Sequence, residues 1–415
     1  MCAWRGGPQK HQDVHRTAPR GAGARPWAAV AALCLLPAGA ALAVEGDTLR
    51  PFVEASLGYD TNLFRFANDA EALASSLGDP IESITFQRYG AGLNVDWKQG
   101  RQRVVGRLGG NQTNFSRYGR YLDYSGYDLR GEWKWQLGNR WSGTMLLGRD
   151  YSQQPYSDQS TGKLTNNLRT DDRRAFQAEY WFHADWRASA RLDYFRRAYD
   201  EDAQRFDNYR TRTTTLGLYT QGNTLERLGL EYLDTRNEYY DRPLFATLDN
   251  ESEEQAVRLV ATWAGSGKTT FSGHIGYARR DYPNVNTKGF DGMEWRLGAR
   301  WLPTGKTLVE ATVQRDLGES DDPGVNFRRV DSASLSATWL ALPKTRLMAR
   351  TRYAQEKYDG TSRKDDTLSA SLSVGYEVWR GGEISAGWEY SRRDSDLASQ
   401  EYQADTLFLS ANLQF

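Results

Sequence analysis

The chain has 415 residues, 53 basic and 53 acidic residues and two cysteines, Cys2 and Cys34. Beyond the first 45 residues no apolar run approaches the roughly 18 residues of a membrane-spanning helix, which excludes a helical membrane protein. The even charge balance and the absence of a Lys/Arg block argue against a nucleic-acid-binding protein, so we expect no nucleic acid among the partners.

The first 43 residues have the pattern of a secretory signal peptide. A basic segment comes first, with Arg5, Lys10, Arg16, Arg20 and Arg25. An apolar stretch over 27–40 follows, and small residues precede the cleavage position after Ala43. We therefore predict a cleaved segment, 1–43, and a mature chain, 44–415. The mature chain has no cysteine, so backbone pairing and packing must hold it together.

The mature chain alternates between apolar and polar residues with a period of two. In the segment 127–137, aromatic and aliphatic residues occupy most odd positions, and charged or polar residues occupy all the even ones. The segments 293–301 and 367–379 alternate in the same way. A period of two places successive side chains on opposite faces of a β-strand, so these segments are predicted strands.

Short and long connections separate the predicted strands in turn. Short turn signals occur at 98–101, 138–139, 184–185, 222–223, 265–267, 303–305, 343–344 and 381–382. Longer polar connections lie near 65–83, 116–121, 154–169, 201–206, 239–251, 283–289, 319–326, 359–364 and 393–400. These 17 connections join 18 strands. Short turns at one end and long loops at the other predict an all-β fold, a closed antiparallel barrel of the bacterial outer membrane.

The tryptophans of the mature chain provide an independent indication. All lie within about seven residues of a short turn and none lies in a long loop. They are Trp97, Trp133, Trp135, Trp141, Trp181, Trp186, Trp263, Trp295, Trp301, Trp339, Trp379 and Trp388. Indole prefers the membrane–water interface, so we predict an aromatic girdle at the periplasmic rim. A soluble β-sandwich or propeller would not place its tryptophans on one side of the turn pattern.

The last strand alternates up to a terminal aromatic residue. The apolar positions are Leu407, Leu409, Ala411, Leu413 and Phe415, and Phe408 is the one apolar residue on the other face. This pattern resembles the C-terminal signal that the outer-membrane assembly machinery recognises. We predict the same role here, with the outer-membrane lipid and that machinery as partners.

Motifs that resemble catalytic or metal sites have simpler interpretations. The stretch GSGKTT at 265–270 lacks the first glycine of a phosphate-binding loop and joins two strands, so it is interpreted as a hairpin turn. The mature chain has only His183 and His274, far apart in sequence. The pairs Asp171–Asp172 and Asp321–Asp322 are assigned to solvated loop edges. We therefore expect a protein that is not an enzyme, without catalytic residues, metal or cofactor.

Alternation assigns many charged residues to the lumen. The predicted lumenal cations are Arg130, Lys134, Arg187, Arg191, Arg258, Arg296, Arg300, Arg346, Arg350 and Arg352. Asp128, Glu132, Asp193, Glu231, Glu294, Glu310, Glu377 and Glu389 share that face. Two interpretations stay open. The charges can pair across strands and fill the barrel, or the guanidinium groups can form a track for a hydrophilic, anionic polymer.

One stretch near the mature N-terminus resembles a known family. Residues 47–66 read DTLRPFVEASLGYDTNLFRF, and the segment Gly58–Arg65 is similar to the start of EpsL-type outer-membrane proteins. These belong to exopolysaccharide gene clusters associated with exosortase and PEP-CTERM sorting in Gram-negative bacteria. Related porins of the same barrel superfamily share a similar start.

The resemblance implies a part in exopolysaccharide biosynthesis or export, with exopolysaccharide and periplasmic export components as partners. The barrel would serve as the exit channel or as a component of it. Two alternatives remain. One is a general diffusion porin for small solutes, and the other is a plugged barrel whose loops bind surface polysaccharide. The connections 154–169 and 65–83 are the candidate plugs.

Overall fold

The computed structural model describes residues 48–75, 77–156, 168–222, 224–244, 248–285, 289–319, 325 and 327–415. The predicted signal segment lies outside these residues, and so does most of the candidate plug 154–169. The chain divides into two units, 1–41 and 42–415, and every element below belongs to the second.

Strands make up nearly all of the regular structure in the described residues, and they form one sheet of 18 strands. In chain order they are β1 (Leu49–Asp60), β2 (Ile84–Gln99), β3 (Gln102–Phe115), β4 (Tyr124–Leu137), β5 (Trp141–Gln153), β6 (Leu168–Trp181), β7 (Trp186–Tyr199), β8 (Tyr209–Thr220), β9 (Leu225–Glu238), β10 (Glu251–Ser266), β11 (Thr269–Asp281), β12 (Phe290–Thr304), β13 (Thr307–Glu319), β14 (Phe327–Leu342), β15 (Thr345–Tyr358), β16 (Lys364–Trp379), β17 (Gly382–Ser395) and β18 (Tyr402–Gln414). Helical segments are short and lie in the longer connections: α2 (Asp69–Ala74), α3 (Gly119–Leu122), η2 (Asp202–Asp207) and η3 (Ala398–Gln400).

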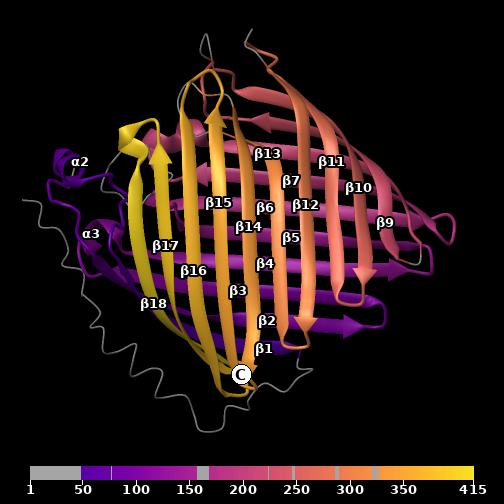
Figure 1. Cartoon of the computed structure of the whole chain (residues 1–415), viewed down its shortest axis with the longest axis horizontal. Helices are drawn as coiled ribbons and strands as arrows, with labels where there is room; N and C mark the ends of the chain where they lie inside the picture. Colours follow the sequence, from indigo (N-terminus) through magenta and orange to yellow (C-terminus); the bar gives the residue numbers. More distant parts are fainter. Residues whose placement is uncertain are drawn as a thin grey trace, which may run out of the picture. The chain divides into compact units, whose positions relative to one another are not determined.

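The sheet closes into a barrel. Each strand pairs antiparallel with its neighbours in the chain, and β1 also pairs with β18, from Phe52 opposite Gln414 to Asp60 opposite Thr406. In Figure 1 the strands β14–β18 of the near wall cross those of the far wall steeply, as tilted strands of a barrel do. The predicted closed antiparallel barrel of 18 strands is confirmed.

The connections follow the predicted order of short turns and longer loops. The GSGKTT stretch is a hairpin, because β10 ends at Ser266 and β11 begins at Thr269. The C-terminus lies at the end of the barrel that carries the short turns (Figure 1). By the rule for outer-membrane barrels this end faces the periplasm, and the longer loops face outward from the cell.

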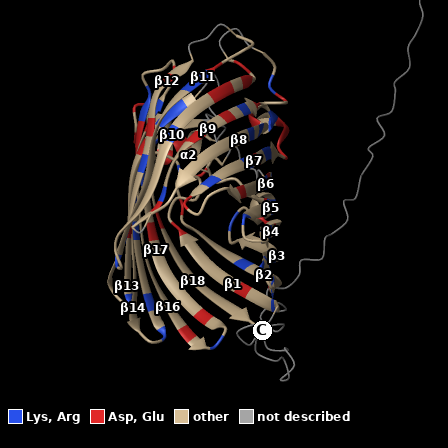
Figure 2. Cartoon of the chain, turned by 90° about the vertical axis from the view of Figure 1, so that its right-hand side faces the viewer, with Lys and Arg blue, Asp and Glu red and all other residues tan. Residues whose placement is uncertain are grey.

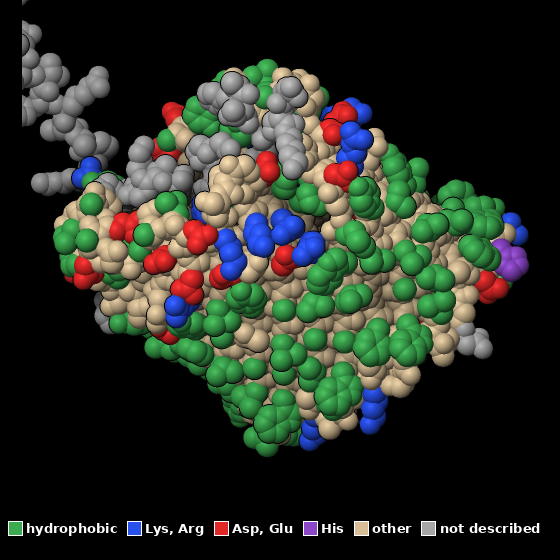
Figure 3. Space-filling model, turned by 45° about the horizontal axis from the view of Figure 1, so that its top comes forward, with side chains coloured by type: hydrophobic (Ala, Val, Ile, Leu, Met, Phe, Trp, Pro, Cys, Tyr) green, Lys and Arg blue, Asp and Glu red, His purple; other side chains and the backbone are tan. Residues whose placement is uncertain are grey.

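Apolar residues form the outer face of the barrel, as the alternation predicts. On β4 the side chains of Leu129 and Trp133 are 44% and 42% exposed, and on β10 those of Val257 and Leu259 are 54% and 47% exposed. Figure 3 shows a broad surface of such hydrophobic side chains. A soluble protein buries side chains of this kind, whereas lipid solvates them at no cost. None of the helices in the described residues is long and apolar enough to cross a membrane.

Phe408, the exception in the last strand, has a structural role on the inner face. Its ring covers Gly387 of the neighbouring strand, where an added Cβ would lie 2.4 Å from the ring. An aromatic ring over a strand glycine restores the packing that the glycine lacks. The apolar residues Leu407 and Leu409 on either side face outward and are both 51% exposed.

Phe415 joins the two ends of the sheet, and we predict that replacing it impairs assembly. Its backbone N–H donates to the carbonyl of Pro51 on β1, at 2.8 Å. We expect Phe415→Ala to lower the folded fraction in the membrane several-fold, because the last strand must be recognised and then paired with β1. Heat-modifiable gel migration measures that fraction. Leu397→Ala, an exposed loop residue, serves as the control. Equal folded fractions would contradict the assembly role.

Candidate functional site: the barrel lumen

The lumen wall carries charges of both signs. The alternation of each strand places the ten predicted lumenal cations on the face opposite the exposed leucines and tryptophans. On β10, for example, Arg258 lies between the outward side chains of Val257 and Leu259. Basic and acidic positions occur on most strands rather than on one (Figure 2).

Two of these cations, Arg258 and Arg346, and also Arg107 are held in ion pairs that skip a strand. Arg258 of β10 donates to both oxygens of Glu294 on β12, at 2.5 and 2.7 Å. The intervening strand has Gly276 between them, where a Cβ would come within 2.8 Å of the Arg258 side chain. The missing side chain therefore leaves room for the bridge. Arg346–Glu383 and Arg107–Glu54 also skip a strand, along a diagonal. Gly375 and Gly90 leave room for the glutamate there, because a Cβ would lie 3.0 Å from Oε1 of Glu383 and 2.8 Å from Oε1 of Glu54.

Other predicted cations have closer or weaker partners. Arg191 donates to Asp193 on its own strand at 2.6 and 2.7 Å. Arg187 lies over the rings of Trp181 and Tyr219, 4.9 and 5.4 Å from their centroids. The remaining pairs are Lys134–Glu132 at 3.2 Å, Arg187–Glu179 at 3.7 Å and Arg300–Glu310 at 3.9 Å. The pairing interpretation therefore accounts for six of the ten predicted cations.

Four predicted cations have no such partner. Within the described residues, Arg130, Arg296, Arg350 and Arg352 make no ion pair or side-chain hydrogen bond, and all four are exposed to the lumen. Arg130 lies on β4, whereas the other three lie on β12 and β15, several strands away around the wall. An unpaired guanidinium keeps its five donors for a solute with carboxylate or phosphate oxygens.

A cavity of about 1180 Å³ follows the inner wall from β2 to β7. Its charged lining includes Arg107, Arg130, Arg173, Arg191, Glu132 and Asp193. Arg107 is a hub of this wall: it bonds Glu54 and Asp128, and its guanidinium lies 3.9 Å from the Phe52 ring centroid. Sequence reasoning did not single out Arg107 or Arg173. Arg107 lies between Gly106 and Leu108 in β3, and this alternation would have identified it. Arg173 lies between Asp172 and Arg174 in β6, where charged neighbours hide the alternation.

The pair Asp171–Asp172 is not solvated as the sequence interpretation assumed. Both residues lie inside β6 and are 8% and 7% exposed. Asp171 accepts two hydrogen bonds from Arg197 at 2.8 Å, and Asp172 accepts two from Arg149 at 2.5 and 2.9 Å. Neighbours in a strand point to opposite faces, so one pair is lumenal and the other is on the outer face. The pair Asp321–Asp322 lies outside the described residues.

Most of the predicted girdle residues lie near the short turns with their indoles outward. Trp141, Trp263, Trp301 and Trp339 are each 47–49% exposed. Trp181 is an exception, because its place on β6 puts it on the inner face under Arg187. Trp295 and Trp388 lie nearer the middle of β12 and β17. The sequence analysis did not anticipate the outward tyrosines toward the other rim, such as the stacked Tyr127 and Tyr151.

The first long loop contacts two neighbouring loops. Phe64 packs edge-on against Tyr156 of the β5–β6 loop, with 4.7 Å between ring centroids, and against Tyr118 of the β3–β4 loop. Burial raises the pKa of Tyr118 above its usual value, and the hydrogen bond to Asp79 acts in the same direction. Three loops thus form one packed group at the outer end of the barrel.

The N-terminal motif forms a latch across the seam between the first and last strands. We call Asp60, Thr61, Asn62 and Arg65 the seam latch. Asp60 accepts two hydrogen bonds from Arg65 and one from Thr406 of β18, at 2.8–2.9 Å. Thr61 exchanges two bonds with the backbone of Asp405, and the Asn62 amide donates to the carbonyls of Phe66 and Gln403.

Potential metal ligands do not converge. No group of three or more His, Cys, Asp or Glu side chains suited to a metal ion occurs in the part of the chain that the structure describes. His183 lies in the turn before β7 and His274 in β11, on separate strands.

Comparison with known proteins gives one family match and distant structural similarity. Residues 264–415 match a family described as "Putative beta-barrel porin 2". No curated protein matches the chain. The fold is similar to OccK2 (OpdF) of Pseudomonas aeruginosa, crystallised with glucuronate, at 13% identity and a TM-score of 0.47 over 89% of this chain and 98% of that one.

Two further solved structures show similarity of the same order. A BenF-like porin from Pseudomonas fluorescens Pf-5 is 11% identical, with a TM-score of 0.48 over 90% of this chain and 100% of that one. OccAB3 of Acinetobacter baumannii is 10% identical, with a TM-score of 0.46 over 89% and 100%.

Three features together indicate a protein that spans a lipid bilayer: the closed barrel, the apolar outer surface and the charged lumen. A sheet without edges is the only β-structure that satisfies its backbone within lipid. The C-terminal 152 residues match a porin family. The chain is a closed β-barrel of the bacterial outer membrane, and its C-terminal part is similar to a porin family.

Proposed function

We propose that the barrel is a diffusion porin for small hydrophilic solutes, with a preference for anions. The observation that carries the proposal is the set of unpaired, exposed lumenal arginines Arg130, Arg296, Arg350 and Arg352. A barrel of 18 strands is wide enough for an aqueous channel. The lumenal cavity of about 1180 Å³ is also large for a small-molecule site.

Conductance of the purified barrel tests this proposal. In planar bilayers with a salt gradient, we expect discrete open-channel steps and a reversal potential of the sign set by anion flow. A small carboxylated sugar should lower the current in a concentration-dependent way, whereas its uncharged counterpart should do so less. A barrel that inserts but does not conduct would contradict the porin proposal.

Exopolysaccharide export is the second candidate, favoured by the similarity of the Gly58–Arg65 segment to EpsL-type proteins. In this role the same lumenal arginines would contact the carboxylates and hydroxyls of a polymer in transit. A narrower variant is a plugged barrel, in which the packed loops around Phe64 bind polysaccharide at the surface.

A clean deletion of the gene distinguishes these roles. If the barrel is the exit route, polysaccharide measured at the cell surface should fall while polysaccharide in the periplasm accumulates. The complementing gene should restore both. Unchanged surface polysaccharide, together with slower uptake of small anionic solutes, would leave the diffusion porin as the function. A closed channel with loop-dependent polymer binding would favour the plugged barrel.

A further inference from the structure

The outer face of the barrel carries three arginines that make no ion pair of their own. Arg174 on β6, Arg196 on β7 and Arg212 on β8 are exposed and share their face with the apolar residues Phe176, Leu192 and Leu216. We call these three the outer arginine cluster. Among the described residues, none of the three makes an ion pair. The nearby carboxylate of Asp172 is bonded to Arg149, and it acts on Arg174 and Arg196 without pairing with either.

Aromatic residues hold the cluster in place. Arg174 and Arg212 flank Tyr194 in one row of paired residues across β6, β7 and β8. The Arg174 guanidinium lies 5.5 Å from the Tyr194 ring, and Nε of Arg196 donates to the Tyr240 hydroxyl at 3.2 Å. With strands about 4.8 Å apart, the Cα atoms of Arg174 and Arg212 lie roughly 10 Å from each other.

Other outward-facing arginines near the same rim form ion pairs with carboxylates, unlike those of the outer arginine cluster. Arg279 pairs with Asp281 at 2.9 Å, Arg315 with Asp331 at 2.5 Å, and Arg392 with Asp394 at 2.7 Å. Arg236 has two acidic neighbours at 3.6 and 3.9 Å. In each of these cases a carboxylate pairs with the arginine itself, whereas Asp172, the carboxylate beside the outer arginine cluster, is paired with Arg149.

An unpaired guanidinium at the lipid boundary favours a phosphorylated lipid. An arginine in the lipid-facing wall is costly toward the bilayer midplane and nearly neutral at its interface. A phosphate group satisfies the guanidinium with two parallel charge-assisted hydrogen bonds. The cluster lies toward the long-loop end, so the lipid it meets is that of the outer leaflet.

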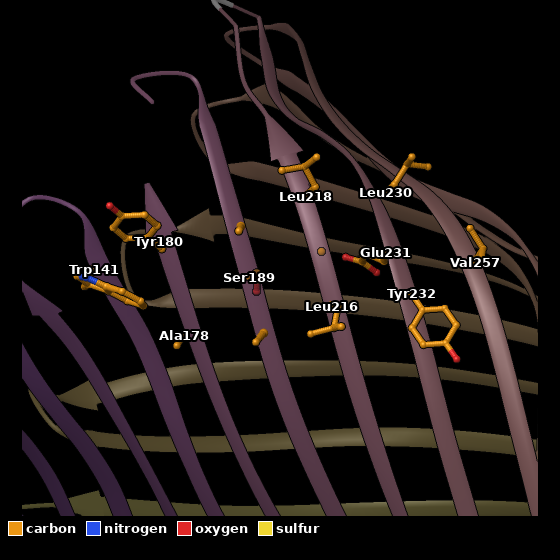
Figure 4. Close-up of a pocket in the computed structure, with 13 residues that line it drawn as sticks. Trp141, Ala178, Tyr180, Ser189, Leu216, Leu218, Leu230, Glu231, Tyr232 and Val257 are labelled. Carbon is orange, nitrogen blue, oxygen red and sulfur yellow. The ribbon is translucent and has the colours of Figure 1, made fainter. Parts of the chain in front are cut away.

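An apolar depression of about 670 Å³ lies on the same face below the cluster. The depression forms because Ala178 and Ala190, which have small side chains, face each other on β6 and β7. The larger side chains of Leu216, Leu218 and Tyr180 border it. Figure 4 shows the lining side chains distributed over adjacent strands. Ala178 and Leu216 lie four residues along their strands from Arg174 and Arg212, or roughly 13 Å. One lipid molecule can therefore contact the cluster with its headgroup and the depression with an acyl chain.

We propose that the outer arginine cluster and this depression form a binding site for lipopolysaccharide, through the phosphates of its lipid A headgroup. The site is independent of what passes through the lumen. It would fix the rotational position of the barrel in the membrane and anchor the wall formed by β6–β8 to the outer leaflet.

Binding of purified lipids to the full-length barrel tests the proposal. Native mass spectrometry in mild detergent with a chelator measures bound diphosphoryl lipid A, its phosphate-free form and phosphatidylglycerol. We expect the wild-type barrel to bind diphosphoryl lipid A at least roughly tenfold more tightly than the phosphate-free form. This comparison needs no variant, so it does not depend on any variant folding. Equal affinities for the two forms of lipid A would overturn the proposal.

Two matched triple variants locate the site. Arg174→Ala, Arg196→Ala and Arg212→Ala together should abolish the preference for the phosphorylated form. The control, Arg236→Ala, Arg279→Ala and Arg315→Ala, removes three outward arginines that have carboxylate partners and should keep the preference. An equal loss in both variants would overturn the assignment.

Two further measurements test whether a free anion or a second copy of the chain occupies the site instead of a lipid. They are competition by pyrophosphate and the oligomeric state of the barrel. Pyrophosphate should compete only weakly, because it cannot use the depression. Competition at the affinity of the lipid would make the site one for free anions and overturn the lipid assignment. An oligomer that the cluster variant dissociates, without any effect of lipid phosphate, would assign this face to a second copy of the chain instead.

Discussion

Replacing Arg296, Arg350 and Arg352 together by glutamine should remove the anion preference of the channel. These three side chains lie on β12 and β15, are exposed to the lumen and have no ion-pair partner within the described residues. Fixed charges in a narrow cleft raise the local concentration of counter-ions at least roughly tenfold. We therefore expect the anion-to-cation permeability ratio to fall by a similar factor, measured from reversal potentials in bilayers with a salt gradient.

The paired and outward-facing arginines provide controls for that experiment. Arg392→Gln removes a positive charge from the outer face, where Asp394 neutralises it, and should leave the permeability ratio unchanged. Arg258→Gln should reduce stability more than selectivity, because it leaves Glu294 buried without its partner. An unchanged permeability ratio in the triple variant would show that these arginines do not govern permeation.

Asp60→Asn should weaken the closed barrel more than any other single change described above. Asp60 is 3% exposed, and its carboxylate accepts bonds from Arg65, Thr406 and the backbone N–H of Asn62. Removing one partner of a buried ion pair costs about 3–5 kcal/mol, because the other charge stays buried. We expect the free energy of unfolding to fall by about 3 kcal/mol, measured by urea titration in lipid vesicles with tryptophan fluorescence.

An exposed ion pair in another loop gives the comparison for Asp60→Asn. Asp202 and Arg205 form a pair at 2.9 Å, but their side chains are 85% and 59% exposed. Asp202→Asn should therefore change the free energy of unfolding by less than about 1 kcal/mol. If Asp60→Asn and Asp202→Asn unfold at the same urea concentration, the seam latch does not contribute to closure.

The sequence was sufficient to predict the barrel, because alternation and turn residues act locally. The hairpin at 265–270 illustrates this. Thr262, where a phosphate-binding loop needs its first glycine, lies within β10, and the glycine-rich residues that follow form the turn to β11. The pairing of charges was harder to predict. Arg258 and Glu294 are 36 residues apart and meet across an intervening strand, which depends on the register of two hairpins and on Gly276.

The same difficulty explains the mistaken interpretation of Asp171 and Asp172. The predicted connection ends at residue 169 and β6 begins at Leu168, so the strand boundary was nearly right. The error was to treat carboxylates beside a loop as solvated, when Arg197 and Arg149 on the neighbouring strands pair with them. The outer arginine cluster could not be predicted from the sequence for a different reason. The alternation marks Arg174 as an exception on an apolar face, but only the paired rows of β6–β8 bring it near Arg212.

The ion pairs that bridge over a glycine also bear on how the barrel acquires its register. A strand that slips by one residue turns all of its side chains to the opposite face. If β11 slipped by one position between its neighbours, Gly276 would face lipid, and Ile275 or Tyr277 would point inward between Arg258 and Glu294. In such a misaligned sheet the bulky side chain would separate Arg258 from Glu294, and neither charge would have its partner. The backbone hydrogen bonds of a strand can form in either register. The three ion pairs form only in the correct one, so they disfavour a sheet in which a strand has slipped by one residue.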